Sequence, residues 1–242
     1  MKTRRLRILA PLITLALVAC GLNVISGSGN AVTEDRRVDS FSAVSLEGNG
    51  ELVIAQGGQA GLTVEAEKNL MKYVRAEFIS DTLTINMATE GGRVIRPTKP
   101  IVYHVTAPNL NRVQVDGSGD LQIDNLETDQ LEIKINGSGG TQIGDLQSDQ
   151  LIYRISGSGD ARITGQVAVQ SIQIDGSGNY QAGDLQCQET QIQLGGSGEV
   201  TVWVQDRLDV AINGSGTVNY YGTPQISQNI SGSGELNNMG EK

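Results

Sequence analysis

The chain has 242 residues, and its 27 acidic and 18 basic side chains give a formal net charge of −9 at pH 7. An acidic chain with few aromatic residues is a poor match for nucleic acid, so we expect no nucleic-acid partner. One histidine and two cysteines are too few for the usual zinc motifs, and we expect neither a metal nor another cofactor.

Residues 1–19 are predicted to be a lipoprotein signal peptide. The apolar run 8–18 follows a basic start and is too short to span a bilayer. Residues 17–20, Leu-Val-Ala-Cys, resemble a bacterial lipobox, which predicts cleavage after residue 19 and lipidation of Cys20. The alternatives are an ordinary signal peptide with a coincidental cysteine and a retained membrane helix. We therefore expect an exported protein anchored by its N-terminal lipid to the cell envelope, at the periplasmic face of the outer membrane or at the cell surface.

Residues 20–33 are rich in Gly, Ser and Asn and are predicted to be a flexible tether. Residues 34–110 contain irregular strand-like segments, and 48–50 (Gly-Asn-Gly) resembles a degenerate corner. Residues 67–75 fit one helical turn or a loop. Because a solenoid needs an atypical terminal unit to shield its core, we expect this part to be an N-terminal β cap.

Residues 111–240 contain a Gly-Ser-Gly triplet seven times, at intervals of 18 to 20 residues. The first glycines are Gly117, Gly137, Gly157, Gly176, Gly196, Gly214 and Gly232. A period near twenty with strand-like residues around each triplet predicts stacked coils. We expect an all-β, single-domain parallel β-solenoid, a right-handed β-helix, in which each coil holds two or three short strands.

One apolar position recurs two residues before each triplet, and polar residues alternate with it. The seven residues are Val115, Ile135, Ile155, Ile174, Leu194, Ile212 and Ile230. This period of two predicts a strand with one buried face, so the six residues from Val115 to Ile212 should stack in one core column. The glycines should form the corners and the central serines a ladder. A catalytic serine needs a base, and the chain has a single histidine, His104, so we expect the serines to be structural and not catalytic.

Two other features offer chemistry. Asp120 and Asp160 occupy equivalent outward positions two coils apart, at a spacing near the upper range for an inverting glycosidase pair, although solvated turn carboxylates are the simpler interpretation. Cys187 has no intrachain partner once Cys20 is lipidated, and we expect it to be a buried structural thiol. We expect no catalytic residues and a non-enzymatic role. The alternative function is a carbohydrate-active enzyme, a polysaccharide lyase or hydrolase, on the same β-helix scaffold.

One outward column changes character towards the C-terminus. It contains Asp124, Gly144, Thr164 and Gly183, and then Trp203, Tyr221 and Met239. Exposed aromatic patches mark contact sites, so these last three residues form a predicted contact patch, and the C-terminal end could pair copies into a homo-oligomer. The other interpretation is that Trp203 folds under the terminal loop.

The segment 41–44, the corner 48–50 and the later Asn-Gly-Ser-Gly units resemble the GIN-domain family, described as head domains of autotransporter adhesins. The resemblance covers roughly residues 30–240. It implies an exported bacterial protein with a β-helical fold and no established enzymatic activity. We therefore expect an adhesin-like lipoprotein that presents a solenoid surface to a protein or a glycan.

Overall fold

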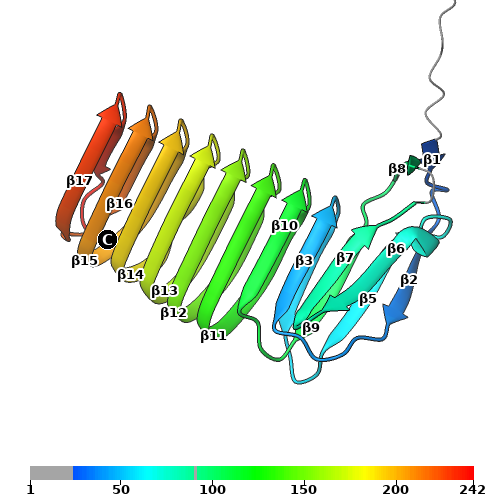
Figure 1. Ribbon diagram of the computed structural model, residues 1–242. Helices are drawn as coiled ribbons and strands as arrows, with labels where there is room; N and C mark the ends of the chain where they lie inside the picture. Colours follow the sequence, from blue (N-terminus) through cyan, green and yellow to red (C-terminus); the bar gives the residue numbers. More distant parts are fainter. Residues whose placement is uncertain (1–23, 90–91) are drawn as a thin grey trace, which may run out of the picture.

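The computed structural model describes residues 24–89 and 92–242. The predicted signal peptide and the predicted lipidation site Cys20 lie outside these ranges. The described chain is an elongated stack of β-strands, with an irregular cap at its N-terminal end and the last coils at the other end (Figure 1). No helix within the described ranges is long and apolar enough to cross a membrane.

The predicted parallel solenoid is confirmed, with one change in the shape of its coils. Most coils are one long, bent strand that ends at a Gly-Ser-Gly corner, not two or three short strands. Parallel pairing between neighbouring coils continues through the bend, which keeps the strand intact. The strands are β10 (Arg112–Gly117), β11 (Asp120–Gly137), β12 (Thr141–Gly157), β13 (Ala161–Gly176), β14 (Tyr180–Gly196) and β15 (Glu199–Gly214), followed by the shorter β16 (Thr217–Tyr221), β17 (Gln225–Gly232) and β18 (Glu235–Asn238).

The predicted core column is also confirmed. Its residues from Val115 to Ile212 pair in register from coil to coil, and none is more than 1% exposed. The column extends into the cap, where Leu46 pairs with Val115 and Ile85 pairs with Leu46. Burial of each such side chain contributes roughly 1.5–3 kcal/mol to folding, so the column is a continuous source of stability along the stack.

The corners require glycine for two physical reasons. Gly137 has a φ of +145°, a conformation that other residues rarely adopt. A Cβ atom on Gly137 would also lie 1.9 Å from the carbonyl oxygen of Gly117 in the preceding coil. Ser138 follows Gly137 in the triplet. Its backbone N–H donates a 3.0 Å hydrogen bond to the same Gly117 oxygen, while its side chain is exposed. The serines are therefore a structural ladder, as predicted.

The core contains a polar layer that the sequence pattern does not reveal. Tyr180 donates a 3.1 Å hydrogen bond to the amide oxygen of Gln170, whose amide nitrogen donates a 3.0 Å bond to Thr190. Gln170 is fully buried, and the ring of Tyr180 lies 5.2 Å from that of Tyr153. Burial raises the pKa of the Tyr180 hydroxyl well above its usual value, so this group stays protonated and remains a donor.

The N-terminal cap departs from simple coil stacking. Antiparallel pairs join β2 to β5, β5 to β9 and β6 to β7, whereas β3 and β4 continue the parallel stack into β10 and β11. Antiparallel edges end the parallel repeat and cover the core at this end. The elements are β1 (Val24–Ser26), β2 (Ala31–Arg36), β3 (Ala43–Gly48), β4 (Glu51–Gln56), β5 (Gly61–Glu67), the 3₁₀ helix η1 (Met71–Tyr73), β6 (Val74–Ile79), β7 (Thr82–Met87), β8 (Val94–Arg96) and β9 (Val102–Ala107).

The expectation of a flexible tether over residues 20–33 is corrected from residue 24 onwards. Strand β1 pairs with β8, and β2 begins at Ala31. Between them, the backbone N–H of Gly29 donates a 2.5 Å hydrogen bond to the buried carboxylate of Glu67. A Cβ on Gly27 would lie 1.8 Å from that carboxylate. Gly27 therefore allows close packing against Glu67, whereas Gly29 provides a φ of +75°.

Glu67 also holds the loop that follows β8. Its carboxylate accepts hydrogen bonds of 2.6 Å from the Thr98 hydroxyl and 2.8 Å from the Thr98 backbone N–H. These bonds, led by that from the Thr98 hydroxyl, lower the pKa of Glu67 to about 2 against the opposing effect of desolvation. One buried charge therefore joins β5, the 27–29 segment and the 98–99 loop.

The C-terminal end of the stack differs from the capped end. Strand β17 pairs with β15, and all eight of its residues are exposed. Ile226 and Ile230 continue core columns but are 43% and 36% exposed. Among the described residues, this end therefore presents apolar side chains in the place where the other end carries a β cap.

Candidate binding surfaces

The predicted contact patch lies on the side of the last coils. Trp203 on β15 and Tyr221 at the end of β16 are register partners on neighbouring strands. Val202 and Val204 on either side of Trp203 are buried, so the indole points outward by the alternation of the strand. Trp203 and Tyr221 are half-buried, and Met239, which is 51% exposed, follows β18. Its backbone N–H donates a 2.8 Å hydrogen bond to the carbonyl of Tyr220, so the structure places Met239 next to the strand of Tyr221 and Tyr221 next to that of Trp203.

The residues of the outward column that leads to this patch do not pair in one continuous register. The pairing of β14 with β15 shifts between Ala182 and Gln186, so Trp203 pairs with Gln186 and not with Gly183. The shorter coil of β15 forces this shift, because residues 183–185 find no partners in it. Gly183 nevertheless lies beneath the patch, since a Cβ on it would be 3.2 Å from the Tyr221 ring.

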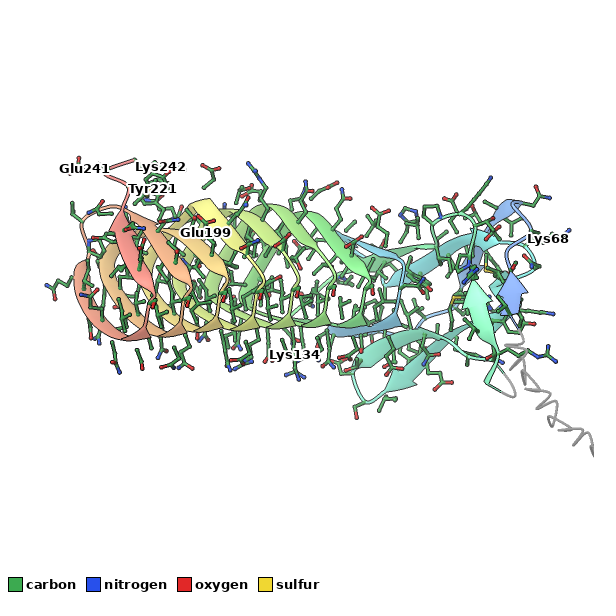
Figure 2. The ribbon with its side chains drawn as sticks, turned by 90° about the horizontal axis from the view of Figure 1, so that it is seen from above. Lys68, Lys134, Glu199, Tyr221, Glu241 and Lys242 are labelled. Atoms are coloured by element: carbon green, nitrogen blue, oxygen red, sulfur yellow. The ribbon has the colours of Figure 1, made fainter. Side chains whose placement is uncertain are left out.

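Lys242 covers the two aromatic rings, a contact that sequence reasoning missed. Its ammonium nitrogen lies 5.6 Å from the ring centroid of Trp203 and 5.3 Å from that of Tyr221. The same nitrogen donates hydrogen bonds to the Gly183 carbonyl and to the Asp184 carboxylate. Figure 2 shows Lys242 and Tyr221 side by side at this end. The Lys242 hydrogen bond holds the pKa of Asp184 below its ordinary value.

A second surface is a shallow polar groove on another wall of the solenoid. The exposed side chains of Glu127, Gln147 and Gln166 line it from three successive strands, in register. The side chain of Gln56 closes the row at the cap, where it exchanges hydrogen bonds of 2.8 and 3.0 Å with the backbone of Glu127. Strand stacking places such side chains at steps of ~4.8 Å, a regular row of amide and carboxylate groups.

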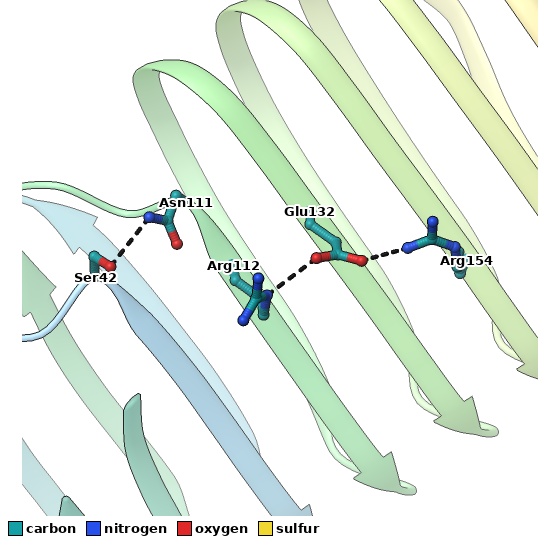
Figure 3. A network of polar contacts seen from close by, with 5 residues as sticks. All are labelled: Ser42, Asn111, Arg112, Glu132 and Arg154. Carbon is teal, nitrogen blue, oxygen red and sulfur yellow. Dashed lines mark hydrogen bonds and ion pairs between the residues drawn. The ribbon is translucent and has the colours of Figure 1, made fainter. Parts of the chain in front are cut away.

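Arg112 and Glu132 at this groove belong to a row of charges, whose contacts Figure 3 shows. Glu132 accepts a 3.0 Å hydrogen bond from Arg112 on one side and another from Arg154 on the other, and thereby links three strands. Asn111 donates a 3.1 Å bond to Ser42, which extends the contacts towards the cap. The three charged side chains are 23–57% exposed, so the pairs contribute only ~0–1 kcal/mol each to stability.

The two carboxylates considered for catalysis, Asp120 and Asp160, accept hydrogen bonds from residues at the corners of neighbouring coils. Asp120 accepts a 2.7 Å hydrogen bond from the backbone N–H of Gly140, and Asp160 accepts bonds of 3.1 and 2.9 Å from the backbone and side chain of Asn179. Each carboxylate therefore stabilises the start of the next coil through a hydrogen bond. Both lie on a common open cleft, and the only histidine, His104, is on β9 in the cap.

Cys187 belongs to a second ladder, at the bend of the coils. Thr128, Ser148, Val167 and Cys187 pair in register, and Ser148 and Cys187 each donate to the backbone carbonyl two residues later. The thiol is 1% exposed, and burial raises its pKa. The Cys187 side chain occupies the position that Thr128, Ser148 and Val167 occupy in the preceding coils. Within the described residues, no cluster of three or more His, Cys, Asp or Glu is arranged to hold a metal ion.

Comparison with known proteins places this geometry in context. The family model "Putative auto-transporter adhesin, head GIN domain" matches residues 40–224. A solved structure of a putative adhesin from Bacteroides fragilis is 26% identical, with a TM-score of 0.83 over 89% of this chain and 100% of that chain. A putative lipid binding protein from Parabacteroides distasonis is also 26% identical, with a TM-score of 0.76 over 89% and 99% of the two chains. A putative adhesin from Parabacteroides merdae, 20% identical, shares the fold with a TM-score of 0.71 over 90% and 99%. The comparison with curated proteins gave no match.

Proposed function

The chain belongs to the GIN-domain family, and we propose on this basis that it is an exported, non-enzymatic lipoprotein of the cell envelope that binds a protein or a glycan through the sides of its solenoid. The family description and the adhesin-like relatives support a role in the envelope or at the cell surface. The lipid on Cys20 and the partner are our own proposals.

The observation that carries the proposal is the position of the two ends. Strand β1 lies at one end of the stack, and strands β15 and β16, which carry Trp203 and Tyr221, lie at the other (Figure 1). The strand order from β6 to β17 contains nine steps, which at ~4.8 Å each span roughly 43 Å. A lipid at Cys20 would hold the capped end at the membrane, so the last coils would project away from it.

A row of amide and carboxylate groups on the side of the solenoid supports a polar partner. The row of Glu127, Gln147 and Gln166 offers hydrogen bonds at a regular spacing, which suits an extended glycan or peptide. The exposed Ile226 and Ile230 on β17 support a further proposal, that two copies pair through their C-terminal ends. Exposed strand edges with apolar side chains favour pairing with another strand.

A glycan array combined with a reducing-end assay tests the proposal and its enzymatic alternative together. We expect saturable binding without release of reducing ends, and weaker binding by a Gln147→Ala, Gln166→Ala double variant. Gln193→Ala is the matched control, because Gln193 is exposed on strand β14 and does not line the groove.

Two results would redirect the proposal. Release of reducing ends that is lost in Asp160→Asn would favour a carbohydrate-active enzyme that uses the cleft of Asp120 and Asp160. Equal binding by the double variant and by wild type would remove the groove as the binding surface.

A further inference from the structure

The contacts of Lys242 define a small site with a specific chemistry. Two aromatic rings, one carbonyl oxygen and one carboxylate surround a single ammonium group. Aromatic faces attract cations through their quadrupole, and the oxygen atoms accept N–H hydrogen bonds. We call Trp203, Tyr221, Gly183 and Asp184 the ammonium site.

The structure points to a ligand that can take the place of Lys242. We propose that the ammonium site binds a lysine side chain of a partner protein, and that Lys242 occupies the site in its absence. The inference deepens the proposed function and rests on it for the existence of a protein partner. A primary ammonium is favoured over a quaternary one because two of the four contacts are hydrogen bonds that the ammonium itself donates.

The hold on Lys242 is weak enough for exchange. The Asp184 side chain is 59% exposed and that of Lys242 is 32% exposed, so solvent screens their ion pair. The preceding tail is fixed only as far as Gly240, whose carbonyl accepts a 2.9 Å hydrogen bond from Gly222. Release of Lys242 therefore needs no break in the strand pairing of the solenoid.

The cleft around the site suits a cation that is attached to a peptide chain. The cleft that contains Gly183, Asp184 and Tyr221 of the site is also lined by Arg162, Asn179, Gln181 and Glu199, among others. Without Lys242 the charged groups of this cleft are two carboxylates and one guanidinium, which leaves one net negative charge. Gly183 keeps the floor open, because a Cβ there would lie 3.2 Å from the Tyr221 ring and 3.3 Å from Thr201.

The site contains its own reporter, since Trp203 is the single tryptophan of the chain. The experiment titrates the purified full chain, in non-ionic detergent, with N-acetyl-lysine methylamide and follows Trp203 fluorescence. We expect a saturable change, with a Kd at least five-fold lower in Lys242→Ala than in wild type, because the resident ammonium no longer competes. Lys242→Met, which keeps the aliphatic stem, should behave in the same way, and far-UV circular dichroism checks the fold of each variant.

Matched probes and variants isolate the chemistry. N-acetyl-norleucine methylamide has a similar shape without the charge and should produce no saturable change. In the Lys242→Ala background, Tyr221→Leu should raise the Kd by about two- to five-fold, the contribution of an exposed cation–π contact. Asp184→Asn should raise it further, because it removes a charge-assisted hydrogen bond.

Three results would overturn the inference: no saturable response to the lysine probe in both folded Lys242 variants, an equal response to the norleucine probe, or a Kd unchanged by Tyr221→Leu and Asp184→Asn. Tighter binding of choline than of the lysine probe would contradict the assignment of a primary ammonium. These titrations use no partner, so failure of the glycan array does not decide them, and their failure leaves the proposed function standing.

Discussion

The Tyr153 hydroxyl donates a 2.8 Å hydrogen bond to the hydroxyl oxygen of Thr141, although both residues belong to the same strand, β12. The two side chains meet across the core because the strand bends through a whole coil. Both are buried, at 0% and 4% exposure, so water cannot replace the bond. This contact shows in one pair how a coil of the solenoid closes on itself.

A double-mutant cycle on this pair should show strong coupling. Tyr153→Phe leaves the buried Thr141 hydroxyl without its donor and should lower the free energy of unfolding by about 1–3 kcal/mol. Adding Thr141→Val removes the unpaired group and should restore most of the loss. Urea denaturation of the four proteins measures the effect, and strictly additive losses would contradict this account.

The repeat could be predicted from sequence because its signals are local and periodic. The column from Val115 to Ile212 and the corner glycines follow from spacing alone. The burial of Gln170 and Thr190 could not be foreseen, because Gln170 on β13 is satisfied by hydrogen bonds to Tyr180 and Thr190 on the neighbouring strand β14. The fixed conformation of the backbone at Gly29 depends on a hydrogen bond to Glu67, which lies 38 residues away in the sequence.

The candidate site was predicted only in part. The aromatic column identified Trp203, Tyr221 and Met239, which the structure brings together. Equal spacing misplaced Gly183 in the register, because the coil of β15 is shorter than its neighbours. Nothing in the pattern pointed to Lys242, since its contact depends on the path of the chain after β18.

Neighbouring substitutions on β14 test the register. Leu194 is 1% exposed in the core column, and the preceding residue, Gln193, is exposed. Leu194→Asp buries an unpaired charge and should cost several kcal/mol, about 4 or more, or prevent folding. Gln193→Asp should change stability by less than ~0.5 kcal/mol. Thermal unfolding measures both, and similar effects would show that the two faces are assigned incorrectly.

A corner glycine should tolerate no side chain. Gly157 has a φ of +137°, and a Cβ on it would lie 2.1 Å from the Gly137 carbonyl oxygen. Gly157→Ala should therefore lower the free energy of unfolding by about 1–3 kcal/mol from backbone strain, and by more from the clash. Gly58→Ala is the control, because a Cβ there meets nothing within 4 Å. Equal denaturation midpoints for the two variants would rule out the close approach of the corners.

The Glu67 carboxylate should make the cap sensitive to acid. Its pKa is lowered to about 2 from 4.5, so its stabilising effect is complete above pH 4.5 and is lost as the pH falls towards 2. Glu67→Gln removes the charge and should be less stable than wild type at pH 7, with the difference shrinking below pH 4.5. Urea denaturation at several pH values measures this, with the exposed Glu77→Gln as control. A pH-independent difference would contradict the role of the charge.

The central claim, that the solenoid is held at the envelope by an N-terminal lipid, is tested most directly by metabolic labelling with an alkyne fatty acid followed by membrane fractionation. The chain has two cysteines, so Cys187→Ser is the matched control for Cys20→Ser. We predict that wild type and Cys187→Ser are labelled and sediment with membranes, whereas Cys20→Ser is neither labelled nor retained. Label and membrane retention that persist in Cys20→Ser would contradict the account.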